Sequence, residues 1–469
     1  MLLDAFGAPI LRVICRLGRS ASAPILGEIS MRYCFVPVTS FLALALFAPV
    51  AVGQSPTANA PKPSAIPVVK VGGTTLPGTA PTGRTSADVV VIPMKGHFGF
   101  DADSSQWIDP DAFAAMVRQA KSLKPKFVVL DIESGGGLVF VMHQVAETIM
   151  TEFPAGDGTM VVAWPGMAGS AASFITLTCP KIVVKPTARV GAALTVVPTP
   201  KGWVAIDDIP GEKSGYSEKI KSFGDAFDRL AMQYGGHPPE IRAAMATQGA
   251  SLYWSPSQRR FFASPPDPKN RGDLKELDNG TSVLTMIAPE MIEYGLATSA
   301  RDESELRSAL GLKSDASLVR LGTELPDWFR AIRNAITPAT KDVDQASAHI
   351  KTFVDGLRAY LKLDGDVKTN DAKRKANVGD KDRDRDAYEA AGRRLRQARD
   401  QASKAAGVAA TKLRDIAKRI DTARTTLSRL GMTPFMLPST AALVPQIRAS
   451  LECHDKGDYA GAINAFTSK

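Results

Sequence analysis

The chain has 469 residues, of which 44% are hydrophobic and 22% charged, which is enough for two or three globular domains. Its formal net charge of +9 would suit an acidic partner. However, no basic stretch is interleaved with aromatic residues. The charge is therefore interpreted as solvating the surface, and no nucleic-acid partner is expected.

Residues 1–53 predict an upstream extension followed by a secretory signal peptide. Translation is expected to start at Met31, which is followed by Arg32, an apolar run and the small residues of positions 51–53. Basic, apolar and small residues in this order are typical of a signal peptide, and the apolar run is short for a membrane span. An uncleaved membrane anchor is the alternative. Cleavage before Gln54 predicts a protein of the periplasm or cell envelope, with membrane association left open.

The mature chain is expected to begin with a disordered linker. Residues 54–86 are rich in Pro, Thr, Ala and Gly and cannot bury a core. Beyond the signal peptide only Cys179 and Cys453 remain, and two cysteines so far apart do not form a disulfide framework.

Residues 87–312 predict an α/β domain. An apolar strand over 88–94 is followed by a helix-start signal at Asp109 and by a second apolar strand over 127–134. A strand–helix–strand crossover implies parallel strands. Glycines at 135–137 follow the second strand directly, and glycine lets backbone amides approach a ligand closely.

A second strand-to-helix turn lies within residues 159–179. A short apolar strand breaks there through small residues into a helix that starts near Ser173. A serine at such a turn lies close to unpaired amides and to the positive end of the helix, which suits a nucleophile. Packing of small residues where a helix crosses a sheet is the alternative. The glycine turn favours the catalytic interpretation, because an oxyanion hole needs amides facing the nucleophile.

Three ordered motifs of this domain resemble those of the Clp-like, crotonase-fold serine peptidases, in particular signal peptide peptidase A and NfeD-type membrane serine proteases. They are Ser134-Gly135-Gly136-Gly137, Ala171-Ala172-Ser173 and Val190-Gly191-Ala192. The sequence departs from the family where Gly135 replaces a proline and where Phe174-Ile175 follow the serine. The resemblance implies stacked parallel sheets with helices and a homo-oligomer. It also implies a peptide or membrane-protein substrate, cleaved by a Ser/Lys dyad without cofactor or metal.

The resemblance also assigns roles to particular residues. Ser173 would be the nucleophile, and the amides of Gly136, Gly137 and Phe174 would form the oxyanion hole. His143 is the histidine nearest to the glycine turn, but the related peptidases place a catalytic histidine after the serine. A Ser/His/Asp triad is therefore not expected.

Two lysines compete for the role of general base in an amphipathic helix that starts near residue 218. Lys219 lies one turn before Phe223, on the face that also carries Leu230 and is expected to be buried. Lys221 aligns instead with Asp228, on the face expected to be exposed. Lys219 is therefore predicted to be the base, with Lys221 as the alternative. Burial would lower its pKa from about 10.4 toward neutrality.

The C-terminal third predicts helices. Residues 313–340 are expected to be a linker, 341–431 a helical hairpin or coiled coil, and 432–469 a tetratricopeptide-like helical hairpin. This tail could bind an envelope partner. A catalytically inactive crotonase-fold scaffold that acts through the tail is therefore the alternative function. A coenzyme-A thioester enzyme of the wider superfamily is disfavoured by export.

Overall fold

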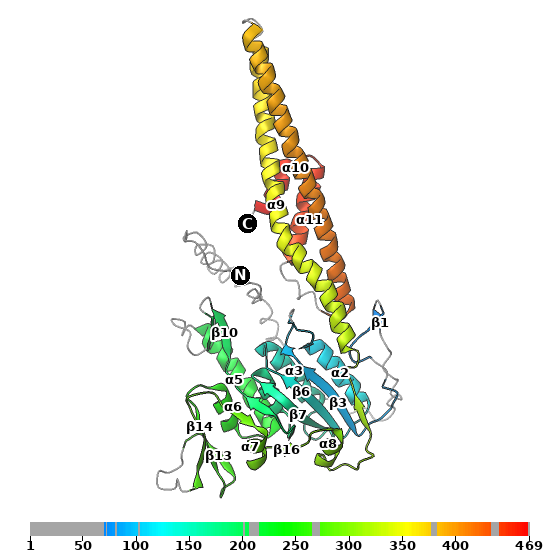
Figure 1. Ribbon diagram of the computed structural model, residues 1–469, viewed down its shortest axis with the longest axis vertical. Coiled ribbons are helices and arrows are strands. Elements are labelled where there is room, and N and C mark those ends of the chain that lie inside the picture. Colours follow the sequence, from blue (N-terminus) through cyan, green and yellow to red (C-terminus); the bar gives the residue numbers. More distant parts are fainter. Residues whose placement is uncertain are drawn as a thin grey trace, which may run out of the picture. The chain divides into compact units, whose positions relative to one another are not determined.

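The computed structural model describes nine segments of the chain (Figure 1). They are residues 70–71, 73–79, 82–101, 104–199, 202–205, 215–264, 273–376, 382–432 and 440–467. The predicted extension, the signal peptide and most of the predicted linker lie outside these residues. No helix in the described segments is both long and apolar enough to cross a membrane.

A large, mostly parallel sheet forms the centre of the N-terminal domain. Its order is β15-β9-β7-β6-β3-β17, with β8 paired to β7 and β16 to β8. Only β15 runs antiparallel to its neighbour. The strands are β3 (Val89–Lys95), β6 (Phe127–Ser134), β7 (Met160–Gly169), β8 (Lys181–Val184), β9 (Arg189–Gly191), β15 (Thr285–Ile287), β16 (Thr298–Ser299) and β17 (Leu318–Arg320). Together with the helices this sheet confirms the predicted α/β class.

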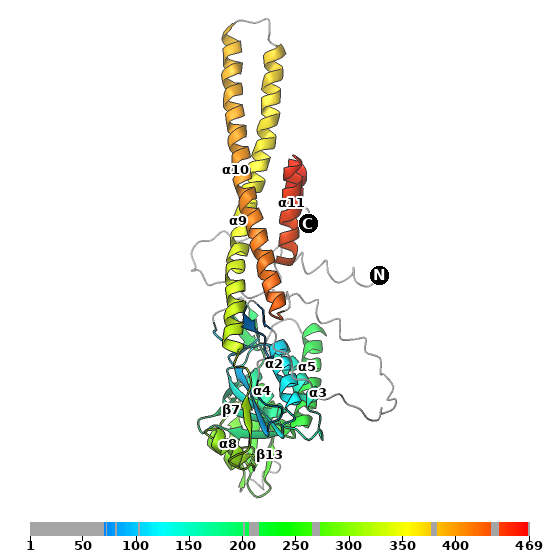
Figure 2. The same ribbon diagram turned by 90° about the vertical axis from the view of Figure 1, so that its right-hand side faces the viewer.

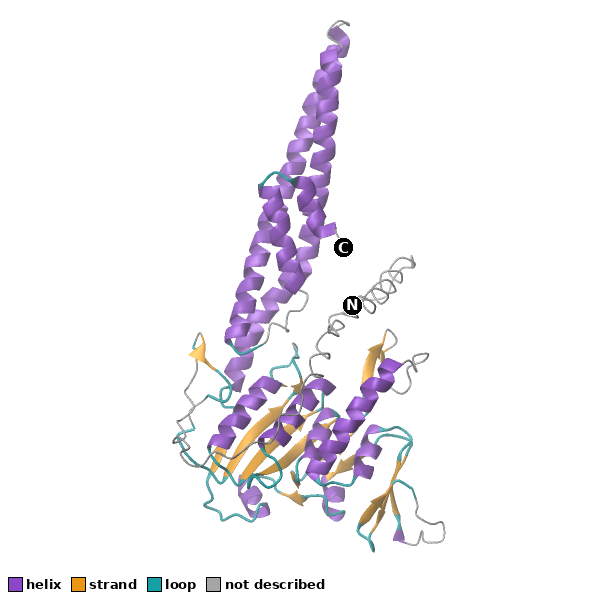
Figure 3. Cartoon of the chain, turned by 180° about the vertical axis from the view of Figure 1, so that it is seen from behind, coloured by secondary structure: helices purple, strands orange, loops and turns teal. Residues whose placement is uncertain are grey.

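Alternate residues of the central strands point to opposite faces of the sheet, because the side-chain period of a strand is two. In β3, Val90 and Ile92 face the main core, whereas Val89 and Val91 face a smaller cluster that includes Leu306. Figure 3 shows the strands as one layer with helices packed along it. The helices of this domain are α2 (Pro110–Ser122), α3 (Val139–Glu152), α4 (Ala171–Thr178), α5 (Gly215–Gly235), α6 (Pro239–Ala246), α7 (Ala288–Glu293) and α8 (Glu303–Ala309).

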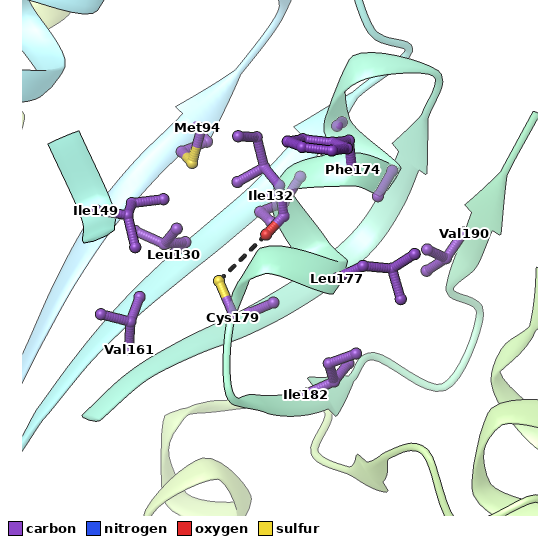
Figure 4. Close-up of a cluster of buried hydrophobic side chains, with 14 of the residues drawn as sticks. Met94, Leu130, Ile132, Ile149, Val161, Phe174, Leu177, Cys179, Ile182 and Val190 are labelled. Atoms are coloured by element: carbon purple, nitrogen blue, oxygen red, sulfur yellow. Dashed lines mark hydrogen bonds between the residues drawn. The ribbon is translucent and has the colours of Figure 1, made fainter. Parts of the chain in front are cut away.

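The main core surrounds α4 (Figure 4). Phe174 and Leu177 of this helix are each 1% exposed and pack with Ile132 of β6 and Val190 of β9. The Cys179 thiol donates a hydrogen bond to the Ile175 carbonyl oxygen at 3.3 Å, and burial raises the pKa of this thiol. Its sulfur therefore stays protonated and behaves as a small apolar group.

Short strands complete the domain. They are β1 (Lys70–Val71), β2 (Thr74–Thr75), β4 (His97–Phe98), β5 (Trp107–Ile108), the hairpin β10 (Val196–Thr199) with β11 (Gly202–Ala205), and the antiparallel sheet β12 (Ser251–Ser255), β13 (Arg260–Phe262) and β14 (Lys275–Asn279). The pair β4 and β5 matters most for the site, since Phe98 bridges to Gly137.

The C-terminal region is helical, as the sequence predicts. It consists of α9 (Leu325–Ala376), α10 (Asp382–Arg429), α11 (Thr440–Asp455) and α12 (Tyr459–Thr467). Helices α9 and α10 lie side by side over much of their length (Figure 2). An apolar seam of Phe353, Leu357, Leu413 and Ile420 joins them, and α11 adds Ile447 to the same cluster.

Two boundaries differ from the prediction. Residues 313–340 are not a linker, because β17 pairs with β3 and α9 already begins at Leu325. The early turns of α9 are stabilised by Trp328, Phe329 and Ile332, which are buried against the first turns of α2 and the end of α10. Part of the predicted linker 54–86 is also ordered, since the Gly78 amide donates to a Glu324 carboxylate oxygen at 2.9 Å.

Asp109 caps α2 beside a cavity of about 150 Å³. Its carboxylate accepts a hydrogen bond from the Ala112 amide at 2.9 Å. The cavity is lined in part by Trp107, Phe113 and Phe329. Burial raises the pKa of Asp109 to about 6, because its effect is larger than that of the cap hydrogen bond, which lowers the pKa.

Stability should therefore depend on pH through Asp109. Its folded-state pKa lies above the unfolded value of about 3.9, so the native state holds an extra proton between the two values. The free energy of unfolding should fall as the pH rises from about 4 to about 6. Asp109→Asn keeps a capping acceptor and removes this titration, so it should be more stable than wild type above pH 6 by about 1–3 kcal/mol. Urea unfolding across this range measures the effect, and identical pH profiles of the two proteins would contradict it.

Candidate active site

Ser170 occupies the turn between β7 and α4. Its backbone has φ +49° and ψ −121°, a left-handed conformation that a residue with a side chain rarely adopts. The Ser170 amide donates to the Gly191 carbonyl oxygen at 2.9 Å, which ties the turn to the predicted Val190-Gly191-Ala192 motif. The side chain is half-buried. A strained serine at a strand-to-helix turn, directly before the first amides of a helix, is in a position for a nucleophile.

Ser173, the serine predicted from the sequence, lies one turn inside α4. It is 0% exposed, and its hydroxyl donates to the Ser170 carbonyl oxygen at 2.7 Å. Because α4 begins at Ala171, the residue at position 173 faces the core. The structure therefore buries the predicted nucleophile and brings Ser170 to the turn in its place.

The glycine turn lies against Ser170. Gly136 has φ +107°, and a Cβ at this position would lie 2.4 Å from the Ser170 Cβ. On its other side the turn is held by two hydrogen bonds to β4, each of 2.9 Å. The Phe98 amide donates to the Gly136 carbonyl oxygen, and the Leu138 amide donates to the Phe98 carbonyl oxygen. The two motifs that the sequence paired are thus in contact.

The predicted oxyanion donors differ in availability. The Gly136 amide donates to the Ser134 hydroxyl at 3.1 Å, and the Phe174 amide lies 3.4 Å from the Ser170 carbonyl oxygen inside α4. Both are therefore already engaged. Ala171 is the first residue of α4, and the first amides of a helix have no intrahelical acceptor. The donors considered for an oxyanion are therefore the amides of Gly137, which follows Gly136 in the glycine turn, and of Ala171, which follows Ser170.

Helices α4 and α5 run side by side in the same direction. The rings of Phe174 and Phe227 lie 6.4 Å apart. Further along both helices, a Cβ at Gly235 would lie 2.0 Å from the Leu177 carbonyl oxygen. Later positions in α4 therefore meet later positions in α5. Because the two helices run in the same direction, the first turns of α5 lie toward the end of α4 that carries Ser170.

Both predicted bases, Lys219 and Lys221, are in these first turns of α5, and their side chains lie outside the described residues. In the described part of the helix the predicted buried face is only partly right, since Ala231 is 0% exposed and Phe227 packs against the main core. Leu230 is 55% exposed, whereas Met232 is 5% exposed and Asp228 forms an ion pair with a residue of α6. The face that contacts the domain is thus rotated from the predicted one toward Asp228 and Met232.

His143 belongs to a neighbouring polar cluster. Its ring stacks on Phe227 with centroids 4.5 Å apart, and its Nε2 lies 3.8 Å from the Asp228 carboxylate. Asp228 is in turn paired with Arg242, whose guanidinium lies 5.4 Å from the Phe174 ring centre. These contacts direct the imidazole toward α5. Within the described segments no group of acidic, histidine or cysteine side chains is arranged to hold a metal ion.

The fold and this turn place the chain among α/β proteins with a parallel sheet and a serine at a strand-to-helix turn. No family model matches the chain, and no curated protein matches it. Two similar solved structures are of the 1510-N membrane-bound stomatin-specific protease. One is a serine-to-alanine variant, and the other is a lysine-to-alanine variant in complex with a substrate peptide. Each is 16% identical, with TM-scores of 0.34 and 0.33. The matches cover 50% and 51% of this chain and 98% and 94% of those chains.

Proposed function

We propose that the protein is a serine peptidase whose nucleophile is Ser170. The observation that carries the proposal is the strained backbone of Ser170 in contact with the glycine turn. Maintaining a residue in this region costs on the order of 1–3 kcal/mol, and such strain is concentrated at functional sites. A packing role alone would be filled by glycine at lower cost.

The proposed reaction is acyl transfer. The Ser170 hydroxyl attacks a peptide carbonyl carbon while a base takes its proton, and the oxyanion that forms accepts hydrogen bonds from the amides of Gly137 and Ala171. The base then protonates the leaving amine, the peptide bond breaks and an acyl-enzyme remains. Water attacks this ester by the same route and restores the serine.

The general base is proposed to be a lysine in the first turns of α5, as in the Ser/Lys dyad predicted from the sequence. Lys221 precedes Asp228 by seven residues, which is close to two helical turns. Asp228 lies on the covered face of α5, so helical spacing now favours Lys221 over the predicted Lys219. A lysine acts as a base only when its amine is neutral, which requires a lowered pKa.

The substrate is proposed to be a peptide segment with apolar side chains. Leu138, Val139 and Phe140 follow the glycine turn directly and are 40%, 39% and 37% exposed. Exposed apolar side chains next to a reactive turn are suited to holding the residues that flank a scissile bond. Export to the periplasm or envelope, inferred from residues 1–53, would supply membrane-derived peptides as such substrates.

Covalent labelling tests this proposal. A fluorophosphonate reacts with activated serine hydroxyls, so incubation followed by peptide mass spectrometry should find the adduct on Ser170. The same preparation should hydrolyse an unstructured, apolar-rich peptide library. An adduct on Ser173 would return the role of nucleophile to that residue, whereas no adduct and no hydrolysis would favour an inactive scaffold.

Replacing each lysine in turn should show which of the two is the general base. Lys221→Ala should lower kcat/KM by about 10³-fold or more because the nucleophile would lose its base, whereas Lys219→Ala should stay within about threefold of wild type. The rate of wild type should rise with pH through the lowered pKa of the lysine, since only the neutral amine accepts the proton. A loss confined to Lys219→Ala would assign the base to that residue.

A further inference from the structure

The positive charge of the protein is concentrated in two helices. Together, α9 and α10 contain 23 Lys and Arg residues against 14 Asp and Glu residues, a net charge of +9. This equals the formal net charge of the whole chain, so the remainder is neutral. The stretch of α10 from 393 to 429 is the most basic part, with 11 cationic and three acidic residues.

Many of these cations are paired with acids of neighbouring helices. Arg396 pairs with an aspartate of α9, and so do Arg399 and Arg419. Arg414 pairs with an aspartate of α11. These pairs have the role expected of interhelical contacts, namely to fix the register of the helices. A second group of cations in α10 takes no part in these interhelical ion pairs.

Four further cations form a line along α10, which we call the basic stripe. They are Arg393, Lys404, Lys418 and Arg429, and none makes an ion pair with another described residue. Their spacings of 11, 14 and 11 residues keep them within about 40° of one another around the helix, because each residue advances 100°. They span about 54 Å at 1.5 Å per residue. All four are exposed.

The basic stripe lies opposite the face that packs against α9. Leu413 and Ile420, which belong to the seam between the helices, are about 160° and 180° away from Arg393 around α10. Between residues 393 and 429 two acids share the outer face, Asp400 and Asp415, and Asp400 is already paired with Arg399. The outer face thus keeps an excess of positive charge along its length.

Two open grooves follow the basic stripe. One, of about 500 Å³, is lined by Arg393, Gln397 and Lys404 among others. The other, of about 530 Å³, lies between α10 and α11 and is lined by Lys418, Arg429, Arg448 and three threonines. Each lining also includes one aspartate, Asp400 or Asp421, which is already paired with an arginine. The other cations and the hydroxyl groups of the grooves are of the kind that bind phosphate oxygens.

We propose that the basic stripe of α10 is a docking surface for the phosphate headgroups of an anionic lipid bilayer. A straight line of cations can meet a flat charged surface along its whole length at once. Each cation near such a surface contributes to attraction, and clusters of four to eight are typical of headgroup-binding segments. The stripe carries no exposed aromatic side chain for base stacking, so a bilayer is favoured over a nucleic acid.

Vesicle binding by the full-length protein tests the proposal. Vesicles of phosphatidylcholine with about one quarter phosphatidylglycerol should bind the protein at least about tenfold more tightly than vesicles of phosphatidylcholine alone. The binding should weaken as salt is raised, because screening acts within about 8 Å at physiological ionic strength. Equal binding to both kinds of vesicle would overturn the proposal. Tighter binding to duplex DNA than to the anionic vesicles, at the same concentration of phosphate groups, would overturn it as well.

A matched pair of variants locates the surface. The stripe variant R393Q/K404Q/K418Q/R429Q should lose at least about tenfold in affinity for the anionic vesicles. The control variant K351Q/K362Q/R394Q/K412Q removes the same charge from exposed cations outside the stripe and should lose less than about threefold. Both should retain the helical circular-dichroism spectrum of wild type. Equal losses in the two variants would mean that net charge alone drives binding, and the stripe would be rejected.

Discussion

Peptide hydrolysis by the Ser170→Ala protein should be at least about 10³-fold slower in kcat/KM than by wild type. Removal of a nucleophile leaves only the contribution of the oxyanion hole and of substrate binding, because nucleophile and base act as one unit. Alanine should not unfold the turn, since the Ser170 amide, which bonds to the Gly191 carbonyl, is retained. Initial rates with an apolar-rich peptide, together with the melting temperature, measure both properties.

Ser173→Ala is the control for this experiment. It removes a hydroxyl three residues further on, in the same helix, whose hydrogen bond runs to the Ser170 carbonyl oxygen. Loss of this bond should cost about 1 kcal/mol of stability and leave the rate within about threefold of wild type. A large loss of activity in Ser173→Ala, with full activity in Ser170→Ala, would restore the assignment made from the sequence.

Gly136→Ala should be the most harmful substitution in the glycine turn. The added Cβ would lie 2.4 Å from the Ser170 Cβ and 2.9 Å from the Gly169 carbonyl oxygen, and a φ of +107° is itself unfavourable for alanine. The turn must therefore move away from Ser170 and carry the Gly137 amide with it. A displacement of about 1 Å at a catalytic group costs about 10²-fold in rate, so kcat should fall by at least that factor.

Gly135→Ala provides the matched comparison one residue earlier. No atom lies within 4 Å of a Cβ built there, and the backbone of Gly135 is not left-handed. Its kcat should stay within about threefold of wild type. If both variants lost activity equally, the contact between the glycine turn and Ser170 would not be the cause.

The sequence predicts the positions of the two turns well but not which serine lies at the second turn. Glycines and small residues mark strand-to-helix turns reliably, because few other residues adopt those conformations. Ser170 and Ser173 are three residues apart, however, and the choice depends on where α4 begins. The first helical residue is Ala171, and helix boundaries are the least certain part of any assignment made from sequence. If the start of the helix is misplaced by one turn, the buried Ser173 is predicted at the turn in place of the half-buried Ser170.

The partial error in the covered face of α5 has a different cause. Helical periodicity identifies an apolar stripe, but it does not show what lies opposite a polar residue. Asp228 is covered because Arg242 from α6 supplies a partner, and this contact joins residues of two separate helices. Leu230 is exposed although it is apolar, which single surface residues often are. Tertiary contacts of this kind are not encoded in the local pattern.

The position of β3 has a consequence for synthesis of the chain. This strand pairs with β6 on one side and with β17 on the other, and Asp88 beside it bonds to Ser317, 229 residues later. At about 5–20 residues per second, a ribosome needs roughly 10–50 s between these two points. For that time one edge of an apolar strand has no neighbour and can pair with other chains. A fragment that stops at residue 312 would keep this edge open permanently, so a soluble N-terminal domain should extend past Leu321.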